Sequence, residues 1–410
     1  MASLRKADFL QAAKHGAVAN LAYAPFDVAE RDRRLHRIWM LMRENGLAAL
    51  VLTSEPNFRY VASFRSPTWV SVTRSRFAVV PLDGLPILIV PESNRILAEA
   101  SGWATEVRTW PAPRAQDDGI SLLLATLREM APTGSIALEV GPDSRIGFPA
   151  ADFLRLLDAI GRGRLADASS LMHNVRAVKS EAEQARHRWA ASASSSALAG
   201  LSSLASIAST DRELHRRIQI ELLDAGIEQV PYLVCAVGDG GYAATNTEPE
   251  GRAFRTGDVL FVDVGATVDG YFSDFNRHVA FGRVDEETSA VYRLVSEALD
   301  AGIAKAAPKT PLVEVWRTMA AVLETRGQSS GIGRLGHSIG LSLTEPPSIA
   351  FDSDAVLEPG MILAIEPSLA YAPAIEGSPS RLMVHEENIL ITETGSVLLS
   401  ERGERELTVI

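Results

Sequence analysis

Hydrophobic and polar positions follow one pattern in the first part of the chain. Apolar runs typical of strands lie at 48–53, 76–81, 85–90 and 134–140. Helical patterns lie near 116–130 and 149–160, and an amphipathic helix that Asp27 can cap and Gly46 can end precedes the first strand. Alternating strands and helices predict an α/β domain over 26–170, behind an N-terminal arm over 1–25.

The second part follows a different pattern. Ser180 and Glu183 form a capping-box signature, which predicts the start of a long helix. The serines at 192–196 within it are interpreted as small residues that pack closely against a neighbouring element. Strand-like runs dominate from Tyr232 onward, interrupted by helical patterns at 284–306 and 311–327. This part is expected to form an α+β domain over 177–410 with largely antiparallel strands.

Two aspartates stand out in the segment VDVGATVDGYFSDFNR. Asp263 and Asp274 lie eleven positions apart on either side of a glycine-bearing turn, and their neighbours are apolar and strand-forming. A buried carboxylate costs several kcal/mol unless it is paired or bound to a metal. Two carboxylates on the two arms of one hairpin therefore indicate a positive partner between them.

Three later segments place similar side chains in apolar or glycine-rich settings. LGHSIG contains His337, ILAIEP contains Glu366, and LMVHEEN contains Glu386 and Glu387. Singly, each has an ordinary structural explanation. Together, several acids and one histidine in strands with few lysines or arginines indicate a pair of divalent ions. Carboxylates and imidazole suit Mn²⁺, Fe²⁺, Co²⁺ or Zn²⁺, and such ions activate water without a serine or cysteine nucleophile.

These motifs resemble the pita-bread metallohydrolases, which include aminopeptidase P, prolidase, methionine aminopeptidase and creatinase. The resemblance rests on D-x₁₀-D, G-H-S-I-G, E-P and H-E-E-N, and it covers most of 177–410. More loosely, EPNFRYVASF (55–64) resembles the N-x-x-Y-x-x-G-F stretch of the creatinase/prolidase N-terminal domain. The resemblance implies a C-terminal pita-bread domain preceded by a smaller α/β domain.

The resemblance also implies a ligand set for two metal ions. Its members are carboxylates and one imidazole: Asp263, Asp274, His337, Glu366 and Glu386. Asp274 and Glu386 would bridge both ions, and Asp263 would serve one of them. His337 and Glu366 would serve the other.

The chain departs from the family's peptidases at two positions. Those peptidases carry a histidine seven residues after the ligand histidine and another seventeen residues before the first aspartate. Here the two positions are Thr344 and Asn246, which can donate hydrogen bonds but do not titrate near neutral pH. Both are candidates for substrate or oxyanion contacts, and Glu366 is the candidate proton relay.

Further substrate-binding candidates lie outside the ligand set. They are Arg65, Trp69, Tyr242 and His385. His278 and His385 are interpreted mainly as supporting residues, because strand alternation points His385 away from its neighbour Glu386. The segment 63–76 is expected to carry Phe64, Arg65 and Trp69 outward, so that the partner's N-terminal domain closes the active site in a homodimer. Related members of the family pair in this way.

Composition limits the partners and the location. The formal net charge is −11 and the isoelectric point about 5.3, which excludes nucleic acid and anionic membranes as expected partners. The single cysteine, Cys235, excludes an internal disulfide. No stretch approaches the roughly 20 apolar residues of a membrane helix. Because the N-terminus also lacks an apolar signal core, a cytoplasmic protein is expected.

The expected function is hydrolysis of a C–N bond in a small amide or a short peptide, by an Xaa-Pro peptidase-like metallohydrolase. One alternative is a metal-dependent lyase of the dimethylsulfoniopropionate-cleaving kind. It would need an aromatic cage for a cationic head, to which Trp69, Trp110, Tyr242 and Tyr271 could contribute. A second alternative is a non-catalytic binding protein on the same fold, although such a protein would be expected to lose metal ligands.

Overall fold

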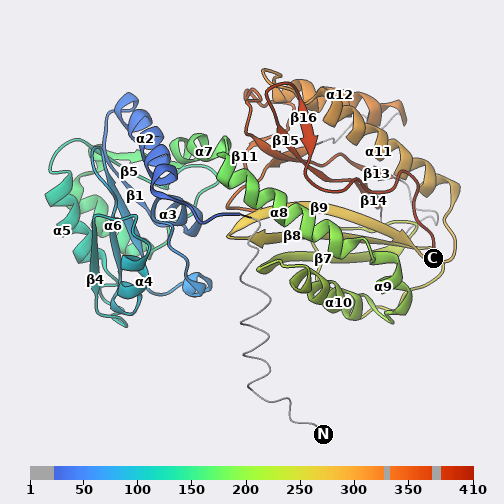
Figure 1. Ribbon diagram of the computed structural model, residues 1–410, viewed down its shortest axis with the longest axis horizontal. Coiled ribbons are helices and arrows are strands. Elements are labelled where there is room, and N and C mark those ends of the chain that lie inside the picture. Colours follow the sequence, from blue (N-terminus) through green and yellow to red (C-terminus); the bar gives the residue numbers. More distant parts are fainter. Residues whose placement is uncertain (1–22, 327–332, 372–379) are drawn as a thin grey trace, which may run out of the picture.

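Two domains lie side by side in the computed structural model (Figure 1). The structure describes residues 23–326, 333–371 and 380–410. The expected N-terminal arm lies almost wholly outside the described residues. None of the described helices is long and apolar enough to cross a lipid bilayer.

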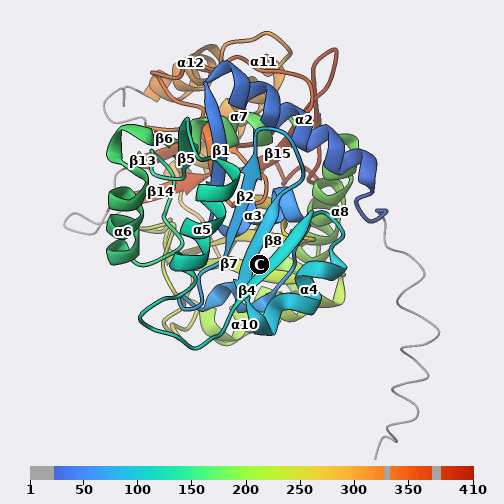
Figure 2. The same cartoon turned by 90° about the vertical axis from the view of Figure 1, so that its left-hand side faces the viewer.

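The N-terminal domain is built on one six-stranded sheet with the order β4-β3-β2-β1-β5-β6 (Figure 2). Its strands are β1 (Leu47–Leu52), β2 (Phe77–Pro81), β3 (Ile87–Pro91), β4 (Glu106–Trp110), β5 (Ser135–Leu138) and β6 (Leu165–Asp167). Its helices are α2 (Val28–Glu44), α3 (Glu55–Ala62), η1 (Pro67–Val70), η2 (Glu92–Asn94), α4 (Arg95–Ala100), α5 (Ile120–Met130), α6 (Ala150–Ile160), η3 (Arg162–Arg164) and α7 (Ser169–Ala177). Strand β2 pairs antiparallel with β1 and with β3, whereas the pairs β1–β5, β5–β6 and β3–β4 are parallel.

The four strands predicted for this domain are confirmed, and β4 and β6 are additional. The Asp27 side chain accepts a hydrogen bond from the Glu30 amide, and Gly46 has a φ of 64°, so the capped and glycine-terminated helix is also confirmed. Apolar side chains of β1, β2, β3 and β5 fill both faces of the sheet, because helices cover each face.

The C-terminal domain has two main sheets. The first is β7-β8-β9, and the second is β11-β10-β12-β15-β16. The strands are β7 (Gln229–Asp239), β8 (Asp258–Val268), β9 (Tyr271–Ala280), β10 (Gly336–Ser338), β11 (Glu345–Ser348), β12 (Ile362–Ile365), β13 (Ser368–Tyr371), β14 (Arg381–Val384), β15 (Glu387–Ile391) and β16 (Ser396–Leu398). All the pairings between them are antiparallel, as predicted.

Helices cover the outer face of each sheet in this domain. They are α8 (Glu181–Leu198), α9 (Leu201–Ile207), α10 (Asp211–Asp224), α11 (Glu286–Lys305), α12 (Leu312–Leu323) and η4 (Glu324–Arg326). The first three pack on β7–β9, and α11 and α12 pack on the five-stranded sheet (Figure 1). The capping box at Ser180 and Glu183 is present. Ser194 is fully buried and lies 3.0 Å from Ser273 of β9, so the serine-rich segment packs closely against a strand, as interpreted.

A stack of charged and aromatic side chains fixes the two domains to each other. The Phe26 ring lies between two guanidinium groups, 4.2 Å from that of Arg34 and 3.5 Å from that of Arg186. Arg34 donates to the Tyr271 hydroxyl across the domain boundary at 3.0 Å, and Arg186 donates to Asp269 at 2.7 Å. Both arginines are almost fully buried, so their planar groups are held by partners on several sides.

The buried imidazole of His187 is expected to make the free energy of unfolding depend on pH. Its Nδ1 lies 2.7 Å from the carbonyl oxygen of Phe272, and burial, helped by Lys179, lowers its pKa to about 3. The folded state therefore keeps a neutral imidazole, while the unfolded chain binds a proton below about pH 6.5. This contribution to stability is lost as pH falls from about 6.5 toward 3, and it amounts to on the order of 3 kcal/mol by pH 4. Chemical denaturation of His187→Gln should show a shallower loss between pH 6 and 4, and an unchanged slope would contradict the assignment.

Candidate metal centre

The β8–β9 hairpin places both aspartates on one face. Asp263 pairs with Asn276, and Asp274 pairs with Gly265. Cross-strand partners share a face, as do residues two apart on one strand. Asp263 and Asp274 therefore share the face turned away from the α8–α10 side, whose core consists of residues such as Val262, Val264 and Phe275.

The second sheet supplies the other three predicted ligands. His337 lies in β10, opposite Ala364 of β12. Glu366 directly follows β12, and Glu386 directly precedes β15. Because Ile365 pairs with Glu387 in antiparallel register, the next positions, Glu366 and Glu386, lie opposite each other.

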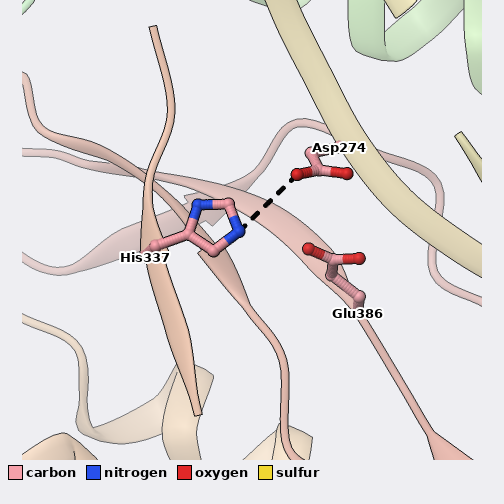
Figure 3. Close-up of side chains that lie close together, drawn as sticks. All are labelled: Asp274, His337 and Glu386. Atoms are coloured by element: carbon pink, nitrogen blue, oxygen red, sulfur yellow. Dashed lines mark ion pairs between the residues drawn. The ribbon is translucent and has the colours of Figure 1, made fainter. Parts of the chain in front are cut away.

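Three of these side chains converge closely enough to hold one ion. The ligand atoms of Asp274, His337 and Glu386 all lie within 4.8 Å of one another, and His337 Nε2 is 3.6 Å from Asp274 Oδ2 (Figure 3). Asp263, Asp274, His337 and Glu386 are all buried, whereas the Glu366 side chain keeps 26% of its exposure. Glu366 is thus the member of the set that solvent reaches.

The crowded carboxylates raise one another's pKa values. Burial raises the pKa of Asp263 to about 6, and burial with the charge of Asp263 raises that of Glu366 to about 7. Burial and the neighbouring acids raise the pKa values of Asp274 and Glu386 well above their ordinary range. Burial, with Arg334 nearby, lowers the pKa of His337 to about 4, so its imidazole is neutral and able to act as a ligand.

The donor set fits divalent cations. Asp263 Oδ1 is buried and has no hydrogen-bond partner among the described residues. Arg334 lies 3.9 Å from Glu366, but its side chain is 40% exposed and it approaches only one of the four acids. Within 23–326, 333–371 and 380–410, no buried lysine or arginine forms an ion pair with these four carboxylates, so divalent ions would allow them to ionise together. This group can therefore hold a divalent metal.

Two supporting residues were missed in the sequence. The Asn388 side chain accepts from the Asp274 amide at 2.8 Å and donates to the Asp274 carbonyl, so it joins β9 to β15 where no backbone ladder does. Tyr232 of β7 donates to Asp263 Oδ2 at 3.1 Å and fixes the orientation of that carboxylate. The H-E-E-N phrase contains Asn388, but neither contact is visible without the sheet registers.

His385 and Tyr242 lie behind the ligands, in an aromatic cluster. The His385 ring centroid is 5.2 Å from that of His278 and 4.3 Å from that of Tyr292. The Tyr242 hydroxyl is 3.2 Å from His278 Nε2 and accepts from the Val384 amide at 2.8 Å. His385 is therefore packed against aromatic rings while the adjacent Glu386 joins the ligand group, and the substrate roles given to His385 and Tyr242 stay predictions.

Glu387 takes no part in the ligand group. Its carboxylate pairs with Arg277 at 3.1 Å and with Arg402 at 3.5 Å. It also accepts a hydrogen bond from the Ser400 hydroxyl. Of the two adjacent glutamates in the H-E-E-N phrase, the structure brings Glu386 to the metal-ligand cluster.

The two positions that replace histidines lie on exposed turns beside the ligand strands. Asn246 follows Thr245, whose carbonyl oxygen lies 3.1 Å from the Tyr232 hydroxyl oxygen, the group that contacts Asp263. Thr344 directly precedes Glu345, which pairs with Ser338 of β10 beside His337. Their predicted roles as hydrogen-bond donors to substrate stay predictions.

The segment 63–76 differs from the expectation. Phe64 is buried, and Trp69 of η1 packs edge-on against Phe58 at 5.5 Å and against Phe64 at 6.5 Å. The prediction that this segment carries Phe64 outward is wrong, because the ring fills the core beneath α3. Arg65 is exposed, but it pairs with Glu228 at 2.8 Å within the same chain.

The aromatic cage considered for a lyase is not formed. Trp69 and Tyr271 belong to the core around α2 and α3, Trp110 to the core under α5, and Tyr242 to the cluster beside Phe261. Tyr271 and Tyr242 are each about 1% exposed, so neither ring can receive a solvated cation. The four rings that could have contributed to a cage under the lyase alternative therefore lie in three separate cores.

Together, the two-domain architecture and the carboxylate–histidine cluster define a metallohydrolase of the pita-bread fold. The model of metallopeptidase family M24 matches residues 185–393, and the creatinase/prolidase N-terminal domain matches 34–178. The chain belongs to metallopeptidase family M24.

Relatives and solved structures agree with this assignment. The chain shares 28% identity over 377 residues with the probable dipeptidase PepE of Mycobacterium tuberculosis, which spans 91% of this chain and 95% of the relative. The crystal structure of dipeptidase PepE from Mycobacterium ulcerans superposes with a TM-score of 0.80 at 26% identity, covering 94% and 100% of the two chains. A recombinant prolidase from Thermococcus sibiricus gives a TM-score of 0.81 at 24% identity over the same shares, which shows the fold alone.

Proposed function

We propose that this chain is a dinuclear-metal hydrolase that cleaves the C–N bond of a dipeptide or another small amide in the cytoplasm. The observation that carries the proposal is the convergence of Asp274, His337 and Glu386 within 4.8 Å, with Asp263 and Glu366 coupled to them electrostatically. The names of the dipeptidase relatives support the substrate class. Mn²⁺, Co²⁺, Fe²⁺ and Zn²⁺ all suit the donors.

The chain's own residues would share the remaining work. When bound, the metal ions activate water and polarise the scissile carbonyl. Glu366 is the partly exposed carboxylate of the group, so it is placed to accept a proton and return it to the leaving amine. The Asn246 amide and the Thr344 hydroxyl would donate hydrogen bonds to the substrate carbonyl or its carboxylate.

The direct test is product analysis on metal-loaded protein. Dipeptides and small N-substituted amino acids are incubated in H₂¹⁸O with each candidate metal, and the products are identified by mass spectrometry. Metal-dependent release of an acid that carries ¹⁸O supports the proposal. Elimination without ¹⁸O would identify a lyase, and no turnover of any substrate by protein with bound metal would favour a binding protein.

We also propose a homodimer in which the tip of the segment 63–76 meets the partner chain. Val70 and Val72 are 92% and 97% exposed, and adjacent apolar side chains so exposed are typical of an interaction site. Trp69 and Phe64 would support this tip from within rather than form the contact.

The valine tip gives a prediction for assembly. Val70→Glu/Val72→Glu should shift the protein from dimer to monomer in light scattering and raise KM by about 10-fold, because charge opposes burial at a contact. Metal content should stay unchanged. A wild-type protein that is monomeric and fully active at working concentration would contradict the proposal, and Val70→Thr/Val72→Thr serves as the conservative control.

A further inference from the structure

A buried cluster of charged side chains lies between the N-terminal domain and the strand that carries His337. Arg176 belongs to α7, Lys179 follows that helix, and Glu345 begins β11. Their exposed fractions are 6%, 3% and 4%. None of the three belongs to the metal-ligand set.

The turn that leads into β11 is wrapped around the Glu345 carboxylate. Glu345 Oε1 accepts from the Ser342 amide at 2.9 Å and contacts the Arg176 guanidinium, and its Oε2 lies 3.9 Å from Lys179 Nζ. A Cβ atom at Gly340 would lie 2.5 Å from both carboxylate oxygens, so the turn can approach this closely only with glycine there. Thr344 lies on this turn.

Arg176 extends the cluster into the N-terminal domain. Its Nη1 donates to Asn57 Oδ1 at 2.7 Å, and Asn57 Nδ2 donates to Glu139 at 2.7 Å. Glu139 in turn accepts from the Ser54 amide at 3.0 Å, at the start of α3. Buried contacts therefore run without a break from the first domain to the turn.

Lys179 extends the cluster toward the metal centre. Its Nζ donates to Ser338 Oγ at 3.1 Å, and the carbonyl oxygen of Ser338 lies 3.0 Å from His337 Nδ1. The partner of Nδ1 decides which way the imidazole ring faces and leaves Nε2 for the ligand group. The same cluster thus touches both the turn of Thr344 and the support of His337.

We propose that Arg176 and Glu345 are positioning residues, which hold the Thr344 turn and β10 in the geometry that the reaction needs and tie that geometry to the N-terminal domain. The inference deepens the proposed hydrolase function and rests on it for its kinetic part. A cavity of about 390 Å³ borders Tyr292. A separate cavity of about 200 Å³ lies where the N-terminal domain meets the Thr344 turn, and Asn57, Arg176 and Thr344 are among the residues that line it. The turn therefore faces space in which a small ligand's end could lie.

The test separates positioning from stability by means of charge balance. Arg176→Met and Glu345→Gln each change the charge of the buried cluster by one unit, whereas Arg176→Met/Glu345→Gln restores the original sum and still removes the ion pair. Replacing both partners of a buried pair is often neutral for stability, while removing one is not. Lys179 keeps its charge in every variant. The double variant, which leaves one buried cation beside position 345, should therefore have a higher Tm than Glu345→Gln alone, which leaves two.

We expect the double variant to alter the geometry of the Thr344 turn without losing its bound metal. The double variant should keep its metal content, show at least 10-fold faster amide hydrogen exchange over 336–345, and lose at least 10-fold in kcat/KM. Arg252→Met/Asp258→Asn is the control, because that pair is also an arginine–carboxylate contact, with both distances 2.7 Å, but contacts neither β10 nor the turn. This control should leave exchange over 336–345 unchanged.

Two results would overturn the proposal. One is wild-type exchange over 336–345 in the double variant, and the other is kinetic loss that follows Tm across all variants and the control. If the metal-loaded wild type hydrolyses no substrate, the proposed function fails instead. The exchange measurement then decides the positioning role by itself.

Discussion

Asp274→Asn is expected to abolish metal binding and hydrolysis together. Wild-type protein should hold about two divalent ions per chain, and the variant should bind each of them more than about 100-fold more weakly, beyond the loss caused by removing a merely supporting residue. The physical reason is that Asp274 lies close enough to Asp263 and Glu366 to feel their charges, and its Oδ2 is 3.6 Å from His337 Nε2. Metal analysis after dialysis, with isothermal titration of Mn²⁺ and Co²⁺, measures the change.

In the metal-free protein, the same substitution should not lower the free energy of unfolding. Because burial, Asp263 and Glu366 raise the pKa of Asp274, its ionised form is unfavourable without a cation. Chelator-treated Asp274→Asn should thus be at least as stable as chelator-treated wild type in denaturant. Asp239→Asn, at the exposed end of β7, is the control and should change neither quantity. Full retention of both ions in Asp274→Asn would refute the ligand assignment.

Weak activity on ordinary Xaa-Pro dipeptides is expected, together with recovery on Asn246→His/Thr344→His. Neither native side chain titrates near neutral pH, and loss of a general acid or base typically costs about 10²–10⁴-fold. The double variant should raise kcat/KM on Ala-Pro or Gly-Pro by at least 10-fold and introduce a pH dependence near the pKa of histidine, about 6.5.

Asn246→Gln/Thr344→Ser is the matched control for this experiment. It preserves the hydrogen-bonding groups and should leave both the rate and the pH profile close to those of the wild type. A wild-type kcat/KM on these dipeptides within 10-fold of that of a histidine-containing prolidase measured alongside would contradict the prediction. Metal content, measured in parallel, excludes indirect loss at the metal centre.

The parts of the fold that could be predicted are those with strong local patterns. The Ser180 capping box and the continuous apolar runs of β1 to β3 depend on neighbours in sequence, so the chain reveals them. β4 was missed because its first four residues are half-buried or exposed and three of them carry polar side chains, and β6 because it has only three residues. Such edge strands are defined by the partner strand more than by their own side chains.

The convergence of Asp274, His337 and Glu386 could be predicted because a buried acid is costly and therefore conspicuous in an apolar strand. The contact of Asn388 could not, since it depends on how the two sheets meet, and that of Tyr232 could not, since it depends on the register between β7 and β8. For Phe64 and Trp69 the sequence suggested an outward-facing contact, but the structure packs both rings against the N-terminal domain. Aromatic residues in a loop are consistent with an interface or with a core, and only the packing against Phe58 distinguishes the two.

The hydrogen bonds of Asn388 between β9 and β15 link the contact between the two sheets to metal binding. Each of the two sheets has its own helices and its own apolar core, but two of the candidate metal ligands belong to the first sheet and three to the second. The affinity for metal should thus depend on the contact between the two sheets. Any motion that separates β9 from β15 also moves the candidate ligands apart. A metal ion that binds only when the two sheets are in contact would stabilise that contact, since any species that binds one form alone shifts the equilibrium toward it.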